Sequence, residues 1–325
     1  MTTRRVRVSV GTAAVLGLVH CKFSDKPTTA YLMTYTQGKC TANCGFCPQA
    51  RTSNAPPNML SRVTWPAFST KEVLKSLKSR NNVKRVCIQA LNYPQVFEDL
   101  LSLIHQIKDE IIPVSVSIQP LKSNQITEMR DAGIERVSIP IDAATPKIFK
   151  EIKGKEIGGP YNWRRHIQTL DYAVKIFGKR RVSTHLIIGL GETEEEAIRF
   201  LQMMVNRDVI PALFAFTPIK GTKLQNRPQP AIDSYRRIQI GSYLIANDLS
   251  AYSKMQFDSE GRLCDFDLCP ERIKEIVESG KPFLTSGCPD CNRPYYNERP
   301  RGSPYNYPRP PTFGEIKIIK QELGI

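Results

Sequence analysis

The sequence predicts an α/β fold: a TIM-type (β/α) barrel, full or partial, followed by an irregular C-terminal extension. Strand-like and helix-like segments alternate from about residue 30 to 250, and alternation at this pace indicates βαβ units and a parallel sheet. Six such units favour a barrel or partial barrel. From about residue 255 the alternation stops, and residues 292–311 are rich in proline, tyrosine and arginine. Their prolines are incompatible with a regular helix.

The individual elements follow from local pattern. Strands are expected at residues 31–37, 83–91, 114–120, 136–142, 181–191 and 211–219. Helices are expected at residues 69–80, 96–110, 123–133, 145–153, 162–178, 193–207 and 231–247. Ser69 with Glu72, and Thr193 with Glu196, have the spacing of capping boxes at two of the helix starts. Gly133 is expected to end its helix.

The chain divides into three predicted regions. We expect residues 1–29 to pack on the barrel, residues 30–250 to form it, and residues 251–325 to form a cysteine-rich extension. Within the first region, an apolar stretch at 8–19 follows basic residues and resembles a weak signal peptide. It is too short to span a bilayer, and we expect no membrane attachment. We expect the run 292–311 to be an ordered tail over the barrel mouth, with a disordered linker as the alternative.

Charge and cysteine usage narrow the functional classes. The 325-residue chain carries a formal net charge of +15, which attracts nucleic acid, acidic proteins or anionic small molecules. A lysine-rich solubilising surface is the alternative. Its nine cysteines are odd in number and clustered, which is more typical of thiolate ligands in a reducing compartment than of a secreted disulfide framework. We therefore expect a cytoplasmic protein.

Three cysteines stand close together after the first expected strand. The segment GKCTANCGFCPQA (38–50) places Cys40, Cys44 and Cys47 in C-x3-C-x2-C spacing. Cysteine thiolates bind iron–sulfur clusters and zinc, and a closed zinc site takes four ligands. Three thiolates on a cubic [4Fe–4S] cluster leave one iron without a protein ligand, so that iron is free to chelate a small molecule. On spacing alone, a zinc site or a structural cluster is the alternative.

The C-x3-C-x2-C loop after the first strand of a βα barrel resembles the radical S-adenosylmethionine (SAM) superfamily. The resemblance implies a [4Fe–4S] cluster on Cys40, Cys44 and Cys47, SAM bound to its open iron, and a reductant such as ferredoxin. The deoxyadenosyl radical that results abstracts hydrogen from C–H bonds, which is chemistry that cofactors carry. The implied nucleoside contacts are Phe46 at the adenine, Asp142 at the ribose, Gly189, Gly191 and Glu192 in GLGET (189–193), and Lys220 in FTPIKGTKL (216–224).

Several of these contacts have simpler alternatives. The two glycines of GLGET fit a tight strand-to-helix turn as well as a close approach to a ligand. Glu192 and Lys220 fit solvated surface charges. Arg164 or Arg165 is a candidate for the methionine carboxylate. His185 is a candidate for substrate contact, with a satisfied core histidine as the alternative.

CPQA, GLGET and IKGT together look like the biotin synthase and lipoyl synthase branch over residues 30–250. Both enzymes insert sulfur at carbon and need a second cluster as the sulfur source. Biotin synthases hold that cluster on barrel strands with three cysteines and an arginine. Cys87 falls at the first of those places, but Ser115 or Ser117 and then Ser183 occupy the next two. A hydroxyl replaces a soft thiolate poorly, so biotin synthesis is in doubt and Cys87 is interpreted as a small buried hydrophobe.

Four further cysteines lie near the C-terminal end. Cys288 and Cys291 have C-x2-C spacing, which lets both thiolates face one metal, and Cys264 and Cys269 have C-x4-C spacing. We predict a second, auxiliary [4Fe–4S] cluster on Cys269, Cys288 and Cys291, with Cys264 as a further candidate ligand. Ordinary core packing is the alternative for Cys264 and Cys269, and zinc is the alternative for the whole set.

A basic barrel with the tail TSGCPDCNRPYYNERP (285–300) looks like one component of the archaeal-type two-component lipoyl synthases. This resemblance implies sulfur insertion at C6 or C8 of an octanoyl-lysine on a lipoyl-carrier protein, together with a homologous radical SAM partner. Biotin synthase-like sulfur insertion on another substrate, radical SAM methylthiolation of RNA, and a non-catalytic scaffold remain open. RNA-modifying relatives usually carry an extra cluster domain before the barrel, and 39 residues precede Cys40. We therefore do not expect nucleic acid as a partner.

Overall fold

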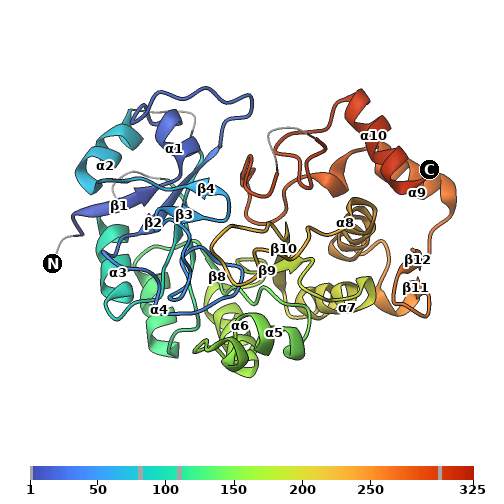
Figure 1. Cartoon of the computed structure of the whole chain (residues 1–325), viewed down its shortest axis with the longest axis horizontal. Coiled ribbons are helices and arrows are strands. Elements are labelled where there is room, and N and C mark those ends of the chain that lie inside the picture. Colours follow the sequence, from blue (N-terminus) through green and yellow to red (C-terminus); the bar gives the residue numbers. More distant parts are fainter. Residues whose placement is uncertain (1–2, 80–82, 108–111, 299–301) are drawn as a thin grey trace.

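A computed structural model of the chain describes residues 3–79, 83–107, 112–298 and 302–325 (Figure 1). Its strands are β1 (Arg5–Val8), β2 (Thr29–Thr34), β3 (Met59–Leu60), β4 (Val63–Thr64), β5 (Ala67–Ser69), β6 (Arg85–Gln89), β7 (Val114–Ser117), β8 (Arg136–Ser138), β9 (Val182–Ile188), β10 (Val209–Ala215), β11 (Gln256–Phe257) and β12 (Leu263–Asp265). Its α-helices are α1 (Val10–Val15), α2 (Thr70–Lys78), α3 (Val96–Ile107), α4 (Ser123–Asp131), α5 (Pro146–Ile152), α6 (Trp163–Phe177), α7 (Glu194–Val205), α8 (Ile232–Ala246), α9 (Pro270–Glu278) and α10 (Phe313–Leu323). Short 3-10 helices are η2 (Lys155–Ile157), η3 (Tyr252–Lys254) and η4 (Lys281–Phe283).

One eight-stranded sheet organises the fold. Its strand order is β10-β9-β8-β7-β6-β2-β1-β5. The six strands from β2 to β10 in this order are parallel, whereas β1 pairs antiparallel with both β2 and β5. Helices α3, α4, α6 and α7 run along the outer side of the strands (Figure 1). The prediction of a partial TIM-type barrel is therefore confirmed.

Alternation along the strands separates the core from the inside of the barrel. In β6, Val86 and Ile88 are fully buried in the main apolar core, whereas Cys87 faces the barrel interior. In β7, Ser115 and Ser117 likewise face the interior. Because side chains alternate with a period of two along a strand, the buried apolar residues of β6 and β7 pack in the core, while Cys87, Ser115 and Ser117 line the inside.

The first residues join the sheet. Val6 and Val8 of β1 are fully buried, and β1 pairs with β2 and β5. The stretch that resembles a weak signal peptide therefore contributes the last residue of β1, Val8, and α1. No helix within the described ranges is long and apolar enough to cross a membrane.

The two predicted capping boxes have different outcomes. At α7 the box is present: the Glu196 N–H donates to Thr193 Oγ1 at 3.1 Å, and the Thr193 N–H donates to Glu196 Oε2 at 3.0 Å. At α2 the prediction is wrong, because Ser69 makes no side-chain capping bond. Ser69 instead ends β5 and pairs with Arg5. Strand pairing therefore determines how the chain enters this helix.

The segment of residues 286–298, here called the bridging segment, connects β10 with the opposite side of the barrel. At the β10 edge of the sheet the Leu213 N–H donates to Ser286 Oγ at 2.9 Å. On the opposite side, Thr28 Oγ1, just before β2, donates to the Asp290 carbonyl at 2.6 Å, and Ser61 Oγ, between β3 and β4, donates to the Tyr296 carbonyl at 3.0 Å. The first part of the proline- and tyrosine-rich run therefore lies over the barrel, across the open side of the sheet.

Gly221→Ala is expected to lower the free energy of unfolding by about 2 kcal/mol. Gly221 has φ +89°, and an added Cβ would lie 2.5 Å from the backbone nitrogen of Ala55. Both the conformation and the contact oppose a side chain. Urea unfolding followed by circular dichroism measures the loss. Gly38→Ala is the control, since a Cβ there meets no atom within 4 Å; equal losses in the two variants would contradict the prediction.

Candidate functional site

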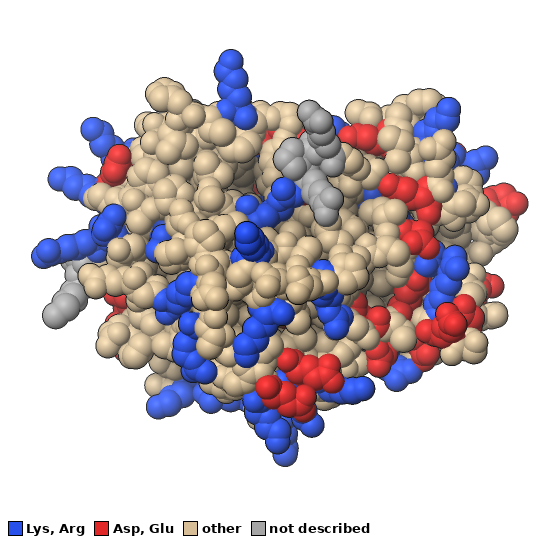
Figure 2. Space-filling view, in the orientation of Figure 1, with Lys and Arg blue, Asp and Glu red and all other residues tan. Residues whose placement is uncertain are grey.

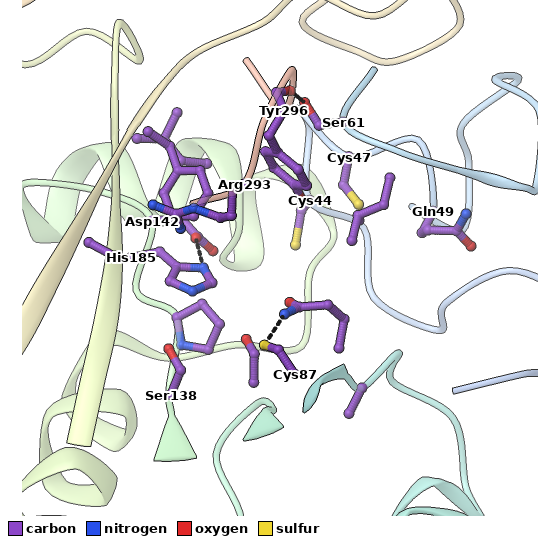
Figure 3. A pocket seen from close by; sticks show the side chains of 18 of the residues that line it. Cys44, Cys47, Gln49, Ser61, Cys87, Ser138, Asp142, His185, Arg293 and Tyr296 are labelled. Carbon is purple, nitrogen blue, oxygen red and sulfur yellow. Dashed lines mark hydrogen bonds and ion pairs between the residues drawn. The ribbon is translucent and has the colours of Figure 1, made fainter. Parts of the chain in front are cut away.

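A large cavity opens at the carboxyl ends of the six parallel strands. Its empty volume is about 1550 Å³, including the part open to solvent. Each of the six parallel strands, the loop of residues 38–54 and the bridging segment contribute to its lining. Three cysteines follow the end of β2, and three more lie elsewhere in the lining; Figure 3 labels Cys44, Cys47 and Cys87.

The loop after β2 brings Cys40, Cys44 and Cys47 to this cavity. The Cys40 N–H donates to the Gln49 carbonyl at 3.0 Å and the Cys47 N–H donates to the Cys44 carbonyl at 3.1 Å, so the loop is folded back on itself. The Asn92 N–H donates to Cys40 Sγ at 3.3 Å. These bonds turn the three thiols toward one space and supply a donor to one sulfur.

The donor set at this loop fits an iron–sulfur cluster. Burial raises the pKa of all three thiols, that of Cys47 to about 12. The thiols are therefore protonated at neutral pH until a metal displaces the protons. In an iron–sulfur cluster each thiolate binds a different iron, and three thiols that line one cavity are the donor set for such a group.

A buried ion pair lies beside the cysteine loop. Lys153, at the end of α5, is fully buried, and its Nζ lies 2.6 Å from Asp142 Oδ2 and 2.5 Å from the Pro140 carbonyl. Asp142 lines the cavity with φ +70°. His185 Nδ1 lies 3.8 Å from the other oxygen of Asp142. Burial lowers the pKa of His185 to about 4, so its imidazole is neutral at pH 7.

A second group of thiols lies deeper in the barrel. Cys87 points inward from the middle of β6, and Cys288 and Cys291 come from the bridging segment. Burial raises the pKa of Cys87, and the neighbouring thiols of Cys288 and Cys291 raise it further. Figure 3 shows Cys87 apart from Cys44 and Cys47, whereas Tyr296 of the bridging segment lies beside Cys44 and Cys47 and Arg293 lies near Asp142.

Comparison with known proteins decides the family. The sequence model of the Radical SAM superfamily matches residues 34–204, which is more than half of the chain. The chain belongs to the radical SAM superfamily. Membership implies a [4Fe–4S] cluster and SAM, and the geometry above places the three cysteines of the loop where such a cluster fits.

Curated relatives of this radical SAM chain are biotin synthases. It is 25% identical to the biotin synthase of Chlamydia pneumoniae over 211 residues, which cover 62% of this chain and 59% of that one. It is 26% identical to the biotin synthase of Saccharopolyspora erythraea over 223 residues, which cover 66% of this chain and 59% of that one. The match therefore spans about three fifths of these relatives' length.

Solved structures share the radical SAM fold. Methylornithine synthase (PylB) aligns with a TM-score of 0.50 and 16% identity, covering 82% of this chain and 85% of that one. The FeFe-hydrogenase maturase HydG from Carboxydothermus hydrogenoformans aligns with a TM-score of 0.51 and 16% identity, covering 73% of this chain and 55% of that one. At this identity the likeness concerns the fold alone.

The structure separates the predicted SAM contacts of this radical SAM barrel. Phe46 and Asp142 line the cavity. Of the described residues that form the lining, none belongs to GLGET, and Lys220 is exposed outside it. Glu192 accepts hydrogen bonds from the Gly189 and Leu190 amides at 2.6 and 3.1 Å, so it closes its own turn. Gly189, with φ +102°, is tightly packed, since a Cβ would lie 2.9 Å from Pro230.

The structure does not bring all four C-terminal cysteines together. Cys264 lies on β12 and Cys269 precedes α9; both are exposed, at the right of Figure 1, and outside the described cavity lining. This placement gives no support to the prediction that Cys264 and Cys269 share a cluster with Cys288 and Cys291, which line the cavity. Arg164 and Arg165 are likewise exposed on α6, outside the described lining.

Two features of the site escaped the sequence analysis. Lys153 lies between Lys150 and Lys155 in the sequence, and no local pattern distinguishes it from these exposed neighbours. For Cys87, the sequence analysis indicates a small buried hydrophobe and does not connect it with Cys288 and Cys291. Its partners lie about two hundred residues further along the chain, and only the packing of the bridging segment brings them together.

Proposed function

We propose that this chain is a sulfur-inserting radical SAM enzyme of the lipoyl synthase type. Its substrate is an octanoyl-lysine on a lipoyl-carrier protein, which it thiolates at C6 or C8. The sulfur comes from an auxiliary iron–sulfur cluster, and a homologous radical SAM protein installs the other sulfur. Biotin synthase relatives support the reaction class, because their product contains sulfur inserted at carbon.

One observation carries the proposal: two separate groups of thiols line the same cavity. Cys40, Cys44 and Cys47 lie at its top, and Cys288 and Cys291 lie deeper, beside β6 and β7. A radical SAM enzyme without sulfur chemistry needs only the first group. A substrate bound between the two groups of thiols has the site of hydrogen abstraction on one side and a sulfur source on the other.

The residues of the chain have distinct roles in this scheme. Bound at the cysteine loop, the [4Fe–4S] cluster and SAM supply a deoxyadenosyl radical that removes a hydrogen atom from a C–H bond. Asp142, held by Lys153, presents a fixed carboxylate to the ribose side of that site. His185 is neutral and offers a polar contact without charge. The bridging segment covers the cavity and keeps water from the radical.

The lining also suits an aliphatic chain. Leu91, Phe214, Phe216 and Tyr296 contribute apolar surface to the lining of the cavity. The Tyr296 ring packs edge-to-face on Phe214 with centroids 5.7 Å apart, and the Arg293 guanidinium lies 4.0 Å from the Phe214 ring centroid. An octanoyl chain needs such a surface, because it gains affinity through buried apolar area rather than through hydrogen bonds.

Surface charge supports a protein-bound substrate. On the face in Figure 2, Lys and Arg are spread over the left and centre, while Asp and Glu gather mainly at the right. Four basic residues at the cavity end of the sheet are exposed: Arg51, Lys155, Lys220 and Lys223. Hydrogen bonds join the loops that carry them. An acidic carrier protein would be attracted to such a surface, with a salt-sensitive association rate.

The test is a thiolation assay. We incubate anaerobically reconstituted enzyme with SAM, a reductant and an octanoyl-lysine peptide. Each enzyme chain is expected to add about one sulfur atom to the peptide, and mass spectrometry detects the thiolated product. Adding the homologous partner gives the doubly thiolated product. Octanoyl-free lysine peptide is the control. If 5′-deoxyadenosine forms but no thiolated peptide appears with the partner present, the proposal fails while radical SAM chemistry stands.

The curated relatives favour a second candidate, sulfur insertion into a biotin precursor. The seryl residues Ser115, Ser117 and Ser183 line the cavity where further thiolates would be needed on the strands. Supplying the desthio precursor of biotin in place of the octanoyl peptide separates the two candidates. Sulfur incorporation into that precursor alone would replace the lipoyl proposal.

A further inference from the structure

We infer that Cys87, Cys288 and Cys291 form a three-thiolate site for a second iron–sulfur cluster inside the barrel. The inference deepens the proposed function and rests on it for the biological role of that cluster. The site itself is argued from the packing of β2, β6 and β7 against the bridging segment. It assigns a ligand role to Cys87 and removes Cys264 and Cys269 from the ligand set.

Sheet register brings the three cysteines to one level of the barrel. Tyr31 of β2 pairs with Cys87 of β6, and Cys87 pairs with Ser115 of β7. Tyr31 Oη lies 3.5 Å from Cys291 Sγ, and the Ser115 side chain lies beside the Cys288 thiol. The two bridging-segment cysteines therefore contact the residues on either side of Cys87.

The bridging segment holds its two cysteines firmly. The Cys291 N–H donates to the Cys288 carbonyl at 3.1 Å, which closes a turn. The Arg293 N–H donates to Tyr31 Oη at 2.9 Å, and Arg85 Nε donates to the Pro289 carbonyl at 3.2 Å. The turn is thus anchored to β2 and β6, the strands that flank and carry Cys87.

The surroundings favour an anionic polynuclear group. Arg136 and Arg293 line the same cavity. Arg85, whose side chain is 5% exposed, contacts Ser115 at 2.9 Å and is paired with Glu135 at 2.6 Å. Positive charge near thiols stabilises their deprotonated, metal-binding form. Thiolates are the ligands of iron–sulfur clusters, in which each thiolate binds a different iron.

The lower barrel also contains an unpaired polar atom. Ser138 lines the cavity and is 7% exposed, and its Oγ has no hydrogen-bond partner among the described residues. A buried hydroxyl without a partner is costly unless a bound group satisfies it.

Outside the two groups of thiols in the cavity, the remaining cysteines, Cys21, Cys264 and Cys269, are exposed. A [4Fe–4S] cluster on Cys87, Cys288 and Cys291 therefore has one iron without a cysteine ligand.

The experiment isolates the second site by deleting the first. A Cys40→Ala/Cys44→Ala/Cys47→Ala chain is reconstituted anaerobically with iron and sulfide, and its iron, acid-labile sulfide and EPR spectrum are measured. We expect this chain to keep one cluster. Adding Cys87→Ala, or Cys288→Ala/Cys291→Ala, is expected to remove the bound iron and sulfide. Adding Cys264→Ala/Cys269→Ala is the matched control and is expected to leave both unchanged.

Cysteine alkylation of the wild-type protein tests the same site without any substitution that could cause misfolding. Reconstituted wild-type protein is alkylated with iodoacetamide before and after iron chelation, and modified cysteines are identified by mass spectrometry. Protection of Cys87, Cys288 and Cys291 that chelation relieves, with Cys264 and Cys269 modified throughout, supports the site. Alkylation of Cys87 at the same rate in both states overturns it, as does zinc as the bound metal.

The outcomes separate this site from the proposed function. If the cluster is held as described but no substrate is thiolated, the site stands and the proposed function fails. If thiolation proceeds and the Cys87→Ala variant keeps its second cluster, the proposed function stands and this ligand set fails.

Discussion

Replacing Cys40, Cys44 and Cys47 together by alanine is expected to reduce cleavage of SAM to 5′-deoxyadenosine to the uncatalysed background. The three thiols line one end of the cavity, and the loop that carries them is held by hydrogen bonds from its own backbone and from Asn92. Without thiolates there is no cluster to deliver an electron, and no side chain supplies radical chemistry in its place. Chromatography of anaerobic reactions containing a chemical reductant measures the product.

The control for this prediction is a chain with Cys21→Ala, Cys264→Ala and Cys269→Ala. These three cysteines are exposed, so their loss is expected to leave SAM cleavage within about twofold of the wild type. Removing three distant thiols tests for a general effect of losing cysteines. Sustained 5′-deoxyadenosine formation by the first variant would contradict the assignment of the cluster to this loop.

Lys153→Met is expected to lower the free energy of unfolding by about 3–5 kcal/mol, as for other buried ion pairs that lose one partner. Lys153 is fully buried and its Nζ contacts Asp142 Oδ2 at 2.6 Å. Methionine fills a similar volume but leaves the Asp142 carboxylate buried without its cation. Urea unfolding at pH 7, followed by tryptophan fluorescence, measures the change.

The double variant Lys153→Met/Asp142→Asn separates charge from packing. Asparagine keeps the shape of Asp142, tolerates its φ of +70° and carries no charge. We expect the double variant to recover most of the stability lost by Lys153→Met alone. A single variant within about 1 kcal/mol of the wild type would show that Asp142 is already neutral or solvated.

Most of the barrel follows from periodicity and turn chemistry. Each of the six parallel strands coincides with an expected segment, because buried β-branched runs between helices have few alternatives. The ends are less predictable. The first strand is expected at 31–37, whereas β2 occupies Thr29–Thr34, since pairing with β1 and β6 extends it backward and the cysteine loop begins sooner. The last residues of the expected helices 69–80 and 96–110 lie outside the described ranges.

The site divides between local and distant signals. Cys40, Cys44 and Cys47 are contiguous enough to be found by spacing alone. The C-x2-C pair of Cys288 and Cys291 is also local, but its partner is not: Cys87 joins it only because the bridging segment lies across the open side of the sheet. Glu192 is the opposite case. Its local motif predicts a contact with the cofactor, whereas its carboxylate accepts hydrogen bonds from the Gly189 and Leu190 amides and stabilises its own turn.

The position of the bridging segment in the sequence also determines the order in which the two groups of thiols become available to bind metal during synthesis. Synthesis proceeds from the N-terminus, and the first elements to emerge can fold before the chain is finished. All six parallel strands and the cysteine loop precede residue 286, so a nascent chain exposes a barrel with one flank open. Cys288 and Cys291 are translated after all six parallel strands. Delivery of metal to the deeper thiols therefore has to wait until the bridging segment has been synthesised, whereas the upper loop is complete much earlier.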